Sequence, residues 1–315
     1  FALLVAVRRG LYACGLLRSI RLPVPVVVVG NLTVGGSGKT PVVDWLAGVL
    51  RVAGHHPGIV SRGHGGTASA QGGLALVPAD GDPGRYGDEP VLLARLTACP
   101  LVVGQDRPAA ARALLRLHPE CDVLIADDGM QHYHLARDLE IAVVDAATLG
   151  NRLLLPAGPL REPLARLAEV DLVLAHGELD AELRAAIGGV PVFPMRLFGE
   201  EVVALADPAC RLPLAALRGR RVHAVAGIGR PQRFFDQLAA AGLEVVAHAF
   251  PDHHRFVAAD LVFGDASPIL MTAKDAVKCR AFAPADCWEY PVRAQIGSGA
   301  AERILEKLED GRTSA

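Results

Sequence analysis

The sequence predicts an α/β protein. We expect a mostly parallel sheet of the P-loop NTPase type with helices on both faces, and a smaller C-terminal α/β domain joined to it by an extended two-stranded connector. Short apolar runs alternate with helical patterns through the first half of the chain. The first run, residues 26–29, leads directly into a glycine-rich turn and a helix. A second strand and glycine turn begin at Val222 and start the smaller domain.

Length and composition restrict the protein class. The 315 residues are enough for two cores, and the net charge of -2 gives no basic face for nucleic acid. Mean hydropathy is high at +0.30. No uncharged apolar run reaches the roughly 18 to 20 residues of a membrane span. Six cysteines without a C-x-x-C spacing indicate neither a zinc site nor a disulfide framework, which favours a reducing cytosol.

Four parts follow along the chain: residues 1–22, 23–190, 191–210 and 211–315. The first part mixes leucines and valines with four arginines, and no acidic residue precedes Asp44. This pattern is typical of a helix at a membrane surface, although the arginines do not share one helical face, so an ordinary packed helix fits equally well. The arginines interrupt the apolar run, which argues against a signal peptide.

The turn after the first strand predicts a phosphate site. Its glycines let backbone N–H groups point inward, and the next helix adds partial positive charge at its N-terminus. Lys39 would reach the β- and γ-phosphates and Thr40 would offer its hydroxyl to Mg²⁺. The pattern departs from Walker A in one place, because Thr33 occupies the position of the first glycine.

Residues 122–126 predict a buried strand that ends in Asp127 and Asp128. This resembles Walker B, whose aspartate holds Mg²⁺ directly or through water. Ligands bind at this edge of a parallel sheet, so Asp127 is expected beside the phosphate turn.

Three further segments carry candidate polar residues. Arg62 follows a strand in a second glycine-rich turn and either meets substrate or is a surface charge. Asp88 stands where a helix N-cap is expected, and capping is enough to explain an aspartate at this position. Asp88 becomes a catalytic candidate only because the other motifs occur in the same chain. Residues 155–163 follow an irregular path that presents Arg161 and Glu162 to a phosphate and a metal, or forms an ordinary exposed ion pair.

The second half predicts a strand at residues 222–226, a helix at 232–241, a strand at 243–250 and a final helix at 300–309. A dinucleotide fingerprint is not met, because Gln232 stands where its third glycine would be. The two histidines after Asp252 point in opposite directions, so they form no metal pair, and we expect one of them to face the interdomain cleft.

Six motifs together resemble the tetraacyldisaccharide 4'-kinase family of lipid A biosynthesis over residues 26–278. They are G-N-L-T-V-G-G-S-G-K-T-P, S-R-G-H-G-G, G-D-E-P, D-D-G-M-Q-H, G-P-L-R-E-P and F-P-D-H-H. The resemblance implies transfer of the ATP γ-phosphate to the 4'-hydroxyl of tetraacyldisaccharide 1-phosphate, giving lipid IVA. It also implies a peripheral or monotopic position at the cytoplasmic face of the bacterial inner membrane, with the lipid disaccharide and the membrane surface as partners and no obligate protein partner.

The resemblance also implies residue roles. Asp88 would be the base on the sugar hydroxyl, paired with His253 from the second domain, and Lys39 would act on the transferring phosphate. Mg²⁺ would be held by Thr40, Asp127 and Glu162. ATP would be bound by Thr33, Val34, Gly35, Gly36, Ser37, Gly38, Lys39, Thr40 and Arg161, and the acceptor by Ser61, Arg62, Asp128, Gln131 and His132. His64 stands where the family usually has an aromatic residue such as tyrosine.

Two alternatives remain open from the sequence. One is a P-loop phosphotransferase for a soluble sugar or nucleoside, in which residues 1–22 only pack on the domain. The other is a nucleotide-dependent switch protein, for which Lys274-Asp275 at a strand end is the hint, although an ion pair between the domains explains those residues as well.

Overall fold

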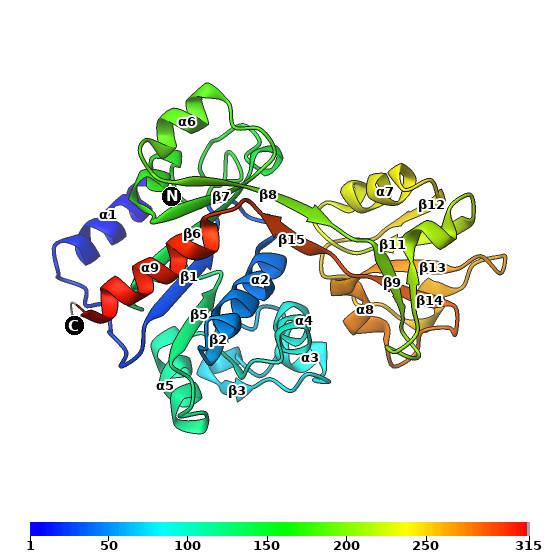
Figure 1. Ribbon diagram of the computed structural model, residues 1–315, viewed down its shortest axis with the longest axis horizontal. Helices are drawn as coiled ribbons and strands as arrows, with labels where there is room; N and C mark the ends of the chain where they lie inside the picture. The colour runs from blue at the N-terminus through cyan, green and yellow to red at the C-terminus, as the bar shows by residue number, and fades with distance from the viewer. Residues whose placement is uncertain (314–315) are drawn as a thin grey trace.

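The structure, a computed structural model, describes residues 1–313 and arranges them around two sheets placed next to one another along the long axis of the molecule (Figure 1). The larger sheet contains β1 (Val26–Gly30), β2 (Pro57–Ser61), β3 (Leu74–Leu76), β4 (Leu101–Gly104), β5 (Val123–Asp127), β6 (Leu139–Asp145), β7 (Leu172–His176), β8 (Val192–Phe198) and β15 (Arg293–Ile296). The smaller sheet contains β9 (Glu201–Ala204), β10 (Arg211–Pro213), β11 (Arg221–Ala226), β12 (Glu244–Ala249), β13 (Ile269–Thr272) and β14 (Cys287–Tyr290).

Strand order in the larger sheet is β15-β8-β7-β6-β1-β5-β2-β4-β3. The strands from β8 to β4 run parallel, and the edge strands β15 and β3 are antiparallel to their neighbours. The central strand β1 lies between β5 and β6, with Val29 opposite Asp127. The predicted α/β class is therefore confirmed, and this register brings the phosphate turn and the Asp127 edge together.

Helices cover both faces of the larger sheet because its strands are apolar on both sides. Val27 and Val29 of β1 belong to one core with α2 (Lys39–Val52), α4 (Asp88–Thr97) and α9 (Ala300–Thr313). Val26 and Val28 face the opposite core, which is shared with α5 (Arg107–Leu117) and α6 (Ala181–Ile187). In the smaller sheet, α7 (Pro231–Ala240) packs on one face and α8 (Ala273–Cys279) on the other.

The link between the sheets differs from the prediction for residues 191–210. That segment holds β8 and β9, which belong to different sheets. On the side away from β7, β8 pairs with β15, which returns from the smaller sheet in the opposite direction (Figure 1). The connector is thus two-stranded, but its strands lie almost 100 residues apart in the chain.

The prediction that the terminal helix belongs to the smaller unit is wrong. Ala300, Ile304 and Leu308 of α9 are buried in the core of the larger sheet, and Lys307 pairs with Asp171 at 2.5 Å. The smaller unit therefore comprises residues 199–292, and the chain returns to the larger unit before it ends.

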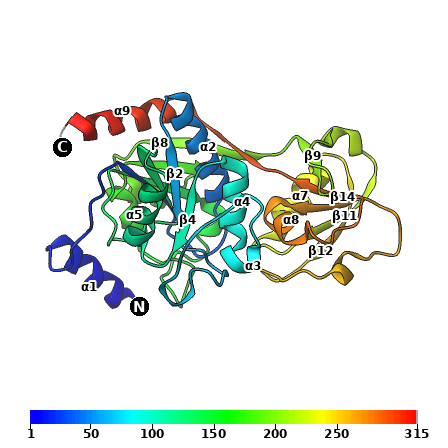
Figure 2. The ribbon, with the colours of Figure 1, turned by 90° about the horizontal axis from the view of Figure 1, so that it is seen from below.

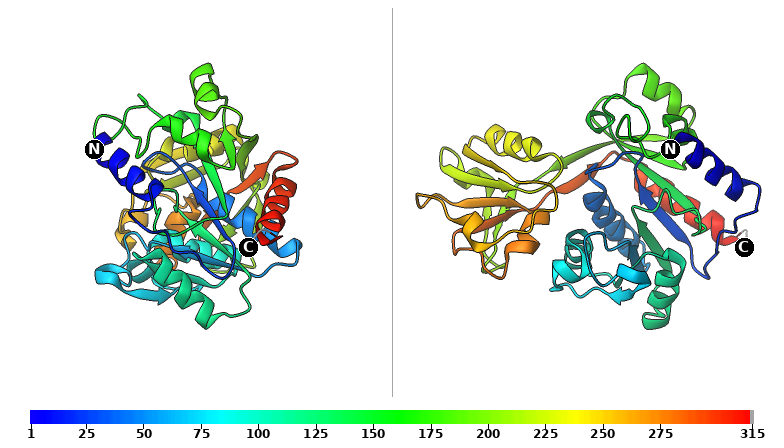
Figure 3. Two further views of the ribbon diagram at one scale, coloured as in Figure 1. Left: turned by 90° about the vertical axis from the view of Figure 1, so that its left-hand side faces the viewer. Right: turned by 180° about the vertical axis from the view of Figure 1, so that it is seen from behind.

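Helix α1 (Ala2–Ala13) lies on the outside of the larger unit, on the side opposite α9 (Figures 2 and 3). None of its residues is buried. The exposed apolar side chains of this segment are Phe1, Leu3, Leu4, Val7, Leu16 and Leu17. Within residues 1–313, no helix has the length and apolar character needed to cross a bilayer.

Candidate active site

The phosphate turn joins β1 to α2. Gly38 is the N-cap of α2 at φ +86°, and Gly35 lies at φ +93°, so both positions use the left-handed region that favours glycine. A Cβ on Gly38 would lie 2.9 Å from Leu197 of β8. The turn is consequently shaped by glycine to leave the helix N-terminus open to an anion.

Lys39 is held at this turn by acceptors from two neighbouring elements. Its ammonium donates to Asn31 Oδ1 at 3.1 Å and lies 3.4 Å from Asp128. Arg161 Nη1 contacts Asp128 at 2.9 Å. Burial raises the pKa of Asp128, but Lys39 and Arg161 outweigh it and hold that pKa well below its usual range. The carboxylate therefore anchors both cations beside the phosphate turn.

Asp127 is the buried carboxylate at the end of β5, 3% exposed. Ser61 Oγ donates to it at 2.9 Å. Burial, then the charges of Glu89 and Asp128, raise its pKa to about 6. Asp127 has no ion pair with any other residue in the described chain. A bound cation would supply the missing positive charge.

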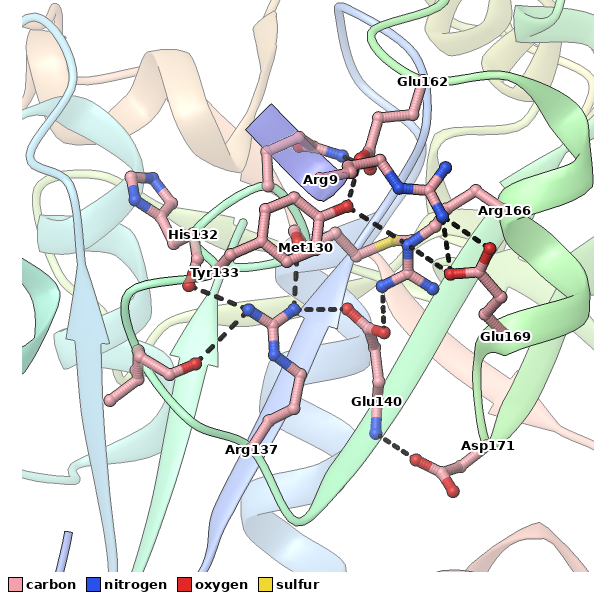
Figure 4. Close-up of polar contacts among 12 residues, drawn as sticks. Arg9, Met130, His132, Tyr133, Arg137, Glu140, Glu162, Arg166, Glu169 and Asp171 are labelled. Atoms are coloured by element: carbon pink, nitrogen blue, oxygen red, sulfur yellow. Dashed lines mark hydrogen bonds and ion pairs between the residues drawn. The ribbon is translucent and has the colours of Figure 1, made fainter. Parts of the chain in front are cut away.

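Glu162 is a second buried carboxylate, 1% exposed, and it too lacks an ion pair among residues 1–313. It accepts hydrogen bonds from Gln131 Nε2 at 3.0 Å and from the Tyr133 hydroxyl (Figure 4). No cluster of three or more His, Cys, Asp or Glu side chains suited to a metal occurs in the described part of the chain. Protein Mg²⁺ sites often use only one or two carboxylates together with substrate phosphates, and Thr40, Asp127 and Glu162 carry oxygen donors of the kind that this ion takes.

A cavity of about 220 Å³ lies between the two units at the phosphate turn. Residues 36–41 and Asp127 line it from the larger unit, and Arg230, Arg233 and Lys274 line it from the smaller one. Thr33, Val34, Gly35, Arg161 and Glu162 do not line this cavity.

Asp88 and His253 meet across the two units. Asp88 Oδ2 lies 3.1 Å from His253 Nδ1, and Asp88 is only 6% exposed. The predicted N-cap position of Asp88 is wrong by one residue: Gly87 is the N-cap, and Asp88 is the first residue of α4. His253 has a left-handed backbone at φ +59°, which is strained for a residue with a side chain. Asp88 and His253 thus meet at the cleft between the two units. The sequence predicted that one of the two histidines would face this cleft.

Lysines of α8 complete this contact. Lys274 and Lys278 each lie 4.0 Å from Asp88 Oδ2, and Lys274 also pairs with Glu89 at 3.1 Å and Asp252 at 3.7 Å. Burial raises the pKa of Glu89, but Lys274 and Lys39 lower it overall. Lys274 is thus ion-paired both with the larger unit at Glu89 and with its own unit at Asp252, whereas Asp275 pairs with Lys278 within α8.

The residues predicted to bind the lipid acceptor do not lie around the Asp88–His253 pair. Asp88 and His253 line a second cavity with His64, whose ring lies 5.4 Å from that of His253. Ser61, Arg62, Asp128, Gln131 and His132 do not line it. Arg62 is exposed. Burial, followed by the charges of Arg107 and Arg62, lowers the pKa of His132 to about 3.

Sequence reasoning missed Glu89, Asp252, Lys278 and Tyr133. Glu89 and Asp252 directly adjoin the predicted Asp88 and His253, and Tyr133 directly follows the predicted His132. The sequence signal that could have identified these three residues is their position next to a predicted site residue. Lys278 had no such signal, because it lies 190 residues from Asp88 in the chain.

Comparisons with known proteins identify the family of this chain. A sequence model of the tetraacyldisaccharide-1-P 4'-kinase family matches residues 1–309. The tetraacyldisaccharide 4'-kinase of Azoarcus sp. (strain BH72) is 68% identical over 100% of this chain and 91% of its own length. That of Aromatoleum aromaticum is 64% identical over 100% and 93%. A crystal structure of LpxK from Aquifex aeolicus in complex with ATP superposes with a TM-score of 0.80 at 29% identity, covering 98% of this chain and 96% of that one. This chain belongs to the tetraacyldisaccharide-1-P 4'-kinase family.

Proposed function

We propose that this chain transfers the γ-phosphate of ATP to the 4'-hydroxyl of tetraacyldisaccharide 1-phosphate and so forms lipid IVA, a step of lipid A biosynthesis. The observation that carries the proposal is the 3.1 Å contact of Asp88 with His253, whose chain neighbours Glu89 and Asp252 line the cavity at the phosphate turn. The names of the relatives and the ATP complex of the Aquifex aeolicus protein support it.

Asp88 is the proposed base. The 4'-oxygen attacks the γ-phosphorus while the bond from that phosphorus to the β,γ-bridging oxygen breaks and ADP leaves, and the hydroxyl proton passes to Asp88. Backbone Glu89 N–H fixes Asp88 Oδ1 at 2.8 Å, which leaves Oδ2 to face His253 and the acceptor. Because His253 comes from the smaller unit, the pair exists only while the two units are in contact at this cleft.

The larger unit is proposed to position ATP. Backbone N–H groups of residues 35–40 would donate to the phosphate oxygens, whereas that of Val34 already donates to the carbonyl of Pro159 at 2.9 Å. Lys39 would exchange its contact with Asn31 for one with the γ-phosphate. Mg²⁺, when bound, neutralises charge that develops on the phosphates, and Thr40, Asp127 and Glu162 would hold it. Arg161, placed by Asp128 at 2.9 Å, would add a second cation to the ATP side.

Recognition of the acceptor is proposed to involve Ser61, Arg62, Asp128, Gln131 and His132. Ser61 and Asp128 are already engaged with Asp127 and with Lys39. Arg62 is exposed beside the second glycine-rich turn, which makes it the most available of the five for an anionic group.

We further propose that the enzyme works at the cytoplasmic face of the bacterial inner membrane. The exposed leucines of α1 and its flanking arginines suit an anionic lipid surface, and a four-acyl acceptor would be found there. Removal of residues 1–22 should abolish sedimentation with vesicles that contain anionic lipid. If the shortened chain sediments as well as the full chain, this part of the proposal is wrong.

The decisive experiment measures label transfer from γ-labelled ATP to tetraacyldisaccharide 1-phosphate in detergent micelles. Lys39→Ala and Asp88→Asn should each lose labelled lipid, and the exposed Asp80→Asn serves as the matched control. ATP hydrolysis without labelled lipid would overturn the acceptor. Equal transfer to a soluble sugar without detergent would favour the soluble-acceptor alternative.

A further inference from the structure

Tyr133 lies between a buried cation and the buried Glu162. Its hydroxyl donates to Glu162 and accepts a hydrogen bond from Arg166 Nε at 3.4 Å (Figure 4). The hydroxyl has a single proton, and its hydrogen bond directs that proton at Glu162.

The same carboxylate is connected to the phosphate turn. Gln131 Nε2 donates both to Glu162 at 3.0 Å and to the carbonyl of Asn31 at 3.2 Å, and Asn31 accepts from Lys39. Glu162 thus has two described donors, Gln131 and Tyr133. Loss of either donor would leave a buried carboxylate oxygen of Glu162 without its hydrogen bond.

The ring of Tyr133 faces the N-terminal helix. Its centroid lies 5.7 Å from that of Tyr12, and the Arg8 guanidinium carbon lies 5.8 Å from the Tyr133 ring. Ser19 Oγ donates to the carbonyl of Tyr133 at 2.6 Å, just after α1. One residue therefore contacts Glu162 through its hydroxyl and the N-terminal segment through its ring and backbone.

A second contact joins α1 to the same cluster. Arg9 Nη2 donates to Glu169 at 2.7 Å, and Glu169 lies 3.8 Å from Arg166, the residue that donates to the Tyr133 hydroxyl (Figure 4). Arg166 is 3% exposed and also pairs with Glu140. Since α1 buries no residue of its own, these polar and aromatic contacts are its described attachments to the larger unit.

We propose that Tyr133 is a positioning residue that fixes the orientation of Glu162 and makes it depend on how helix α1 is seated. The inference rests on the proposed place of Glu162 beside Mg²⁺. An exposed apolar helix that docks on lipid would thereby influence the metal side of the ATP site. No such dependence is expected if α1 is only an anchor.

The test measures Mn²⁺ affinity of the full chain by electron paramagnetic resonance, with a non-hydrolysable ATP analogue and without acceptor. Tyr133→Phe keeps the ring contacts and removes the hydroxyl, so we expect about tenfold weaker Mn²⁺ binding, as is usual for a lost partner of a metal ligand. Tyr12→Leu and Arg9→Ala, which alter only α1, should weaken it about threefold. Arg18→Ala, an exposed arginine with no described ion pair, should leave it unchanged.

Glu162→Gln separates the possible failures. If Glu162→Gln weakens Mn²⁺ binding and Tyr133→Phe does not, the positioning role is wrong while the metal role of Glu162 stands. If Glu162→Gln has no effect, the metal role fails, and the inference fails with it. Unchanged binding in both α1 variants would overturn the dependence on α1. A purely structural role of Tyr133 would lower the thermal unfolding midpoint and leave Mn²⁺ affinity intact, and that result would also overturn the inference.

Discussion

Replacing Asp127 by asparagine should stabilise the protein while it abolishes activity. The carboxyl pKa is raised from 3.8 to about 6 in the folded chain by burial and by neighbouring Glu89 and Asp128. Between these two values the folded state binds more protons than the unfolded state, so stability falls as pH rises. A difference of two units corresponds to about 3 kcal/mol at pH 8, since each unit is worth about 1.4 kcal/mol.

The size of this effect must depend on pH. At pH 5 the carboxyl of Asp127 is already mostly protonated in the folded state. By the linkage relation, the free-energy cost of burying it is then about half of its value at pH 8. The free energy of unfolding of Asp127→Asn should therefore exceed that of the wild type by about 3 kcal/mol at pH 8 and by about half as much at pH 5. Urea unfolding without nucleotide is followed by tryptophan fluorescence in a Trp288→Phe background, so that Trp45 in α2 alone reports on the larger unit.

Two controls make the measurement specific. Asp80→Asn, at an exposed aspartate, should show no pH-dependent gain. ATP with Mg²⁺ should stabilise the wild type more than Asp127→Asn, because the variant lacks the charge proposed to hold the ion. A variant less stable than the wild type at pH 8, or a gain equal at both pH values, would refute the reasoning.

Other predictions concern single contacts. Asp88→Asn should lower kcat about 100-fold or more without changing the Kd for ATP, because general-base catalysis is worth that much; a changed Kd with intact kcat would contradict its role. Gly38→Ala should weaken ATP binding about tenfold, since the left-handed backbone costs alanine about 1–2 kcal/mol and its Cβ meets Leu197; calorimetry would show it. Glu289→Gln should destabilise the protein by about 1–3 kcal/mol, because it removes the buried carboxylate that accepts from the partly exposed Arg95 and Arg280; an unchanged denaturation midpoint would count against this.

Local patterns in the sequence predicted what depends on neighbouring residues. The helix predicted at residues 232–241 is α7, Pro231–Ala240, within one residue at each end, and the strands that precede the phosphate turn and Asp127 are confirmed. Apolar periodicity and glycine placement decide these elements within a few residues.

The sequence did not reveal which strands and helices pack together when they lie far apart in the chain. A strand such as β15 has the same period whichever sheet it joins, so its return to β8 is invisible in the pattern. The terminal helix α9 shows an amphipathic pattern but not which core receives it. In the site, the contact of Asp88 with His253 followed from the family resemblance, whereas the two lysines beside it required the folded arrangement.

The antiparallel pairing of β8 and β15 makes the smaller unit an insert with adjoining ends. Phe198, where the chain leaves the larger sheet, is paired with Arg293, where it comes back. Residues 199–292 could thus be excised and replaced by a short hairpin turn that closes β8 onto β15. Such a miniature would keep the phosphate turn, Asp127 and Asp88 on an unbroken nine-stranded sheet, and it would show how much nucleotide binding the larger unit achieves without the side chains that the insert brings to the cleft.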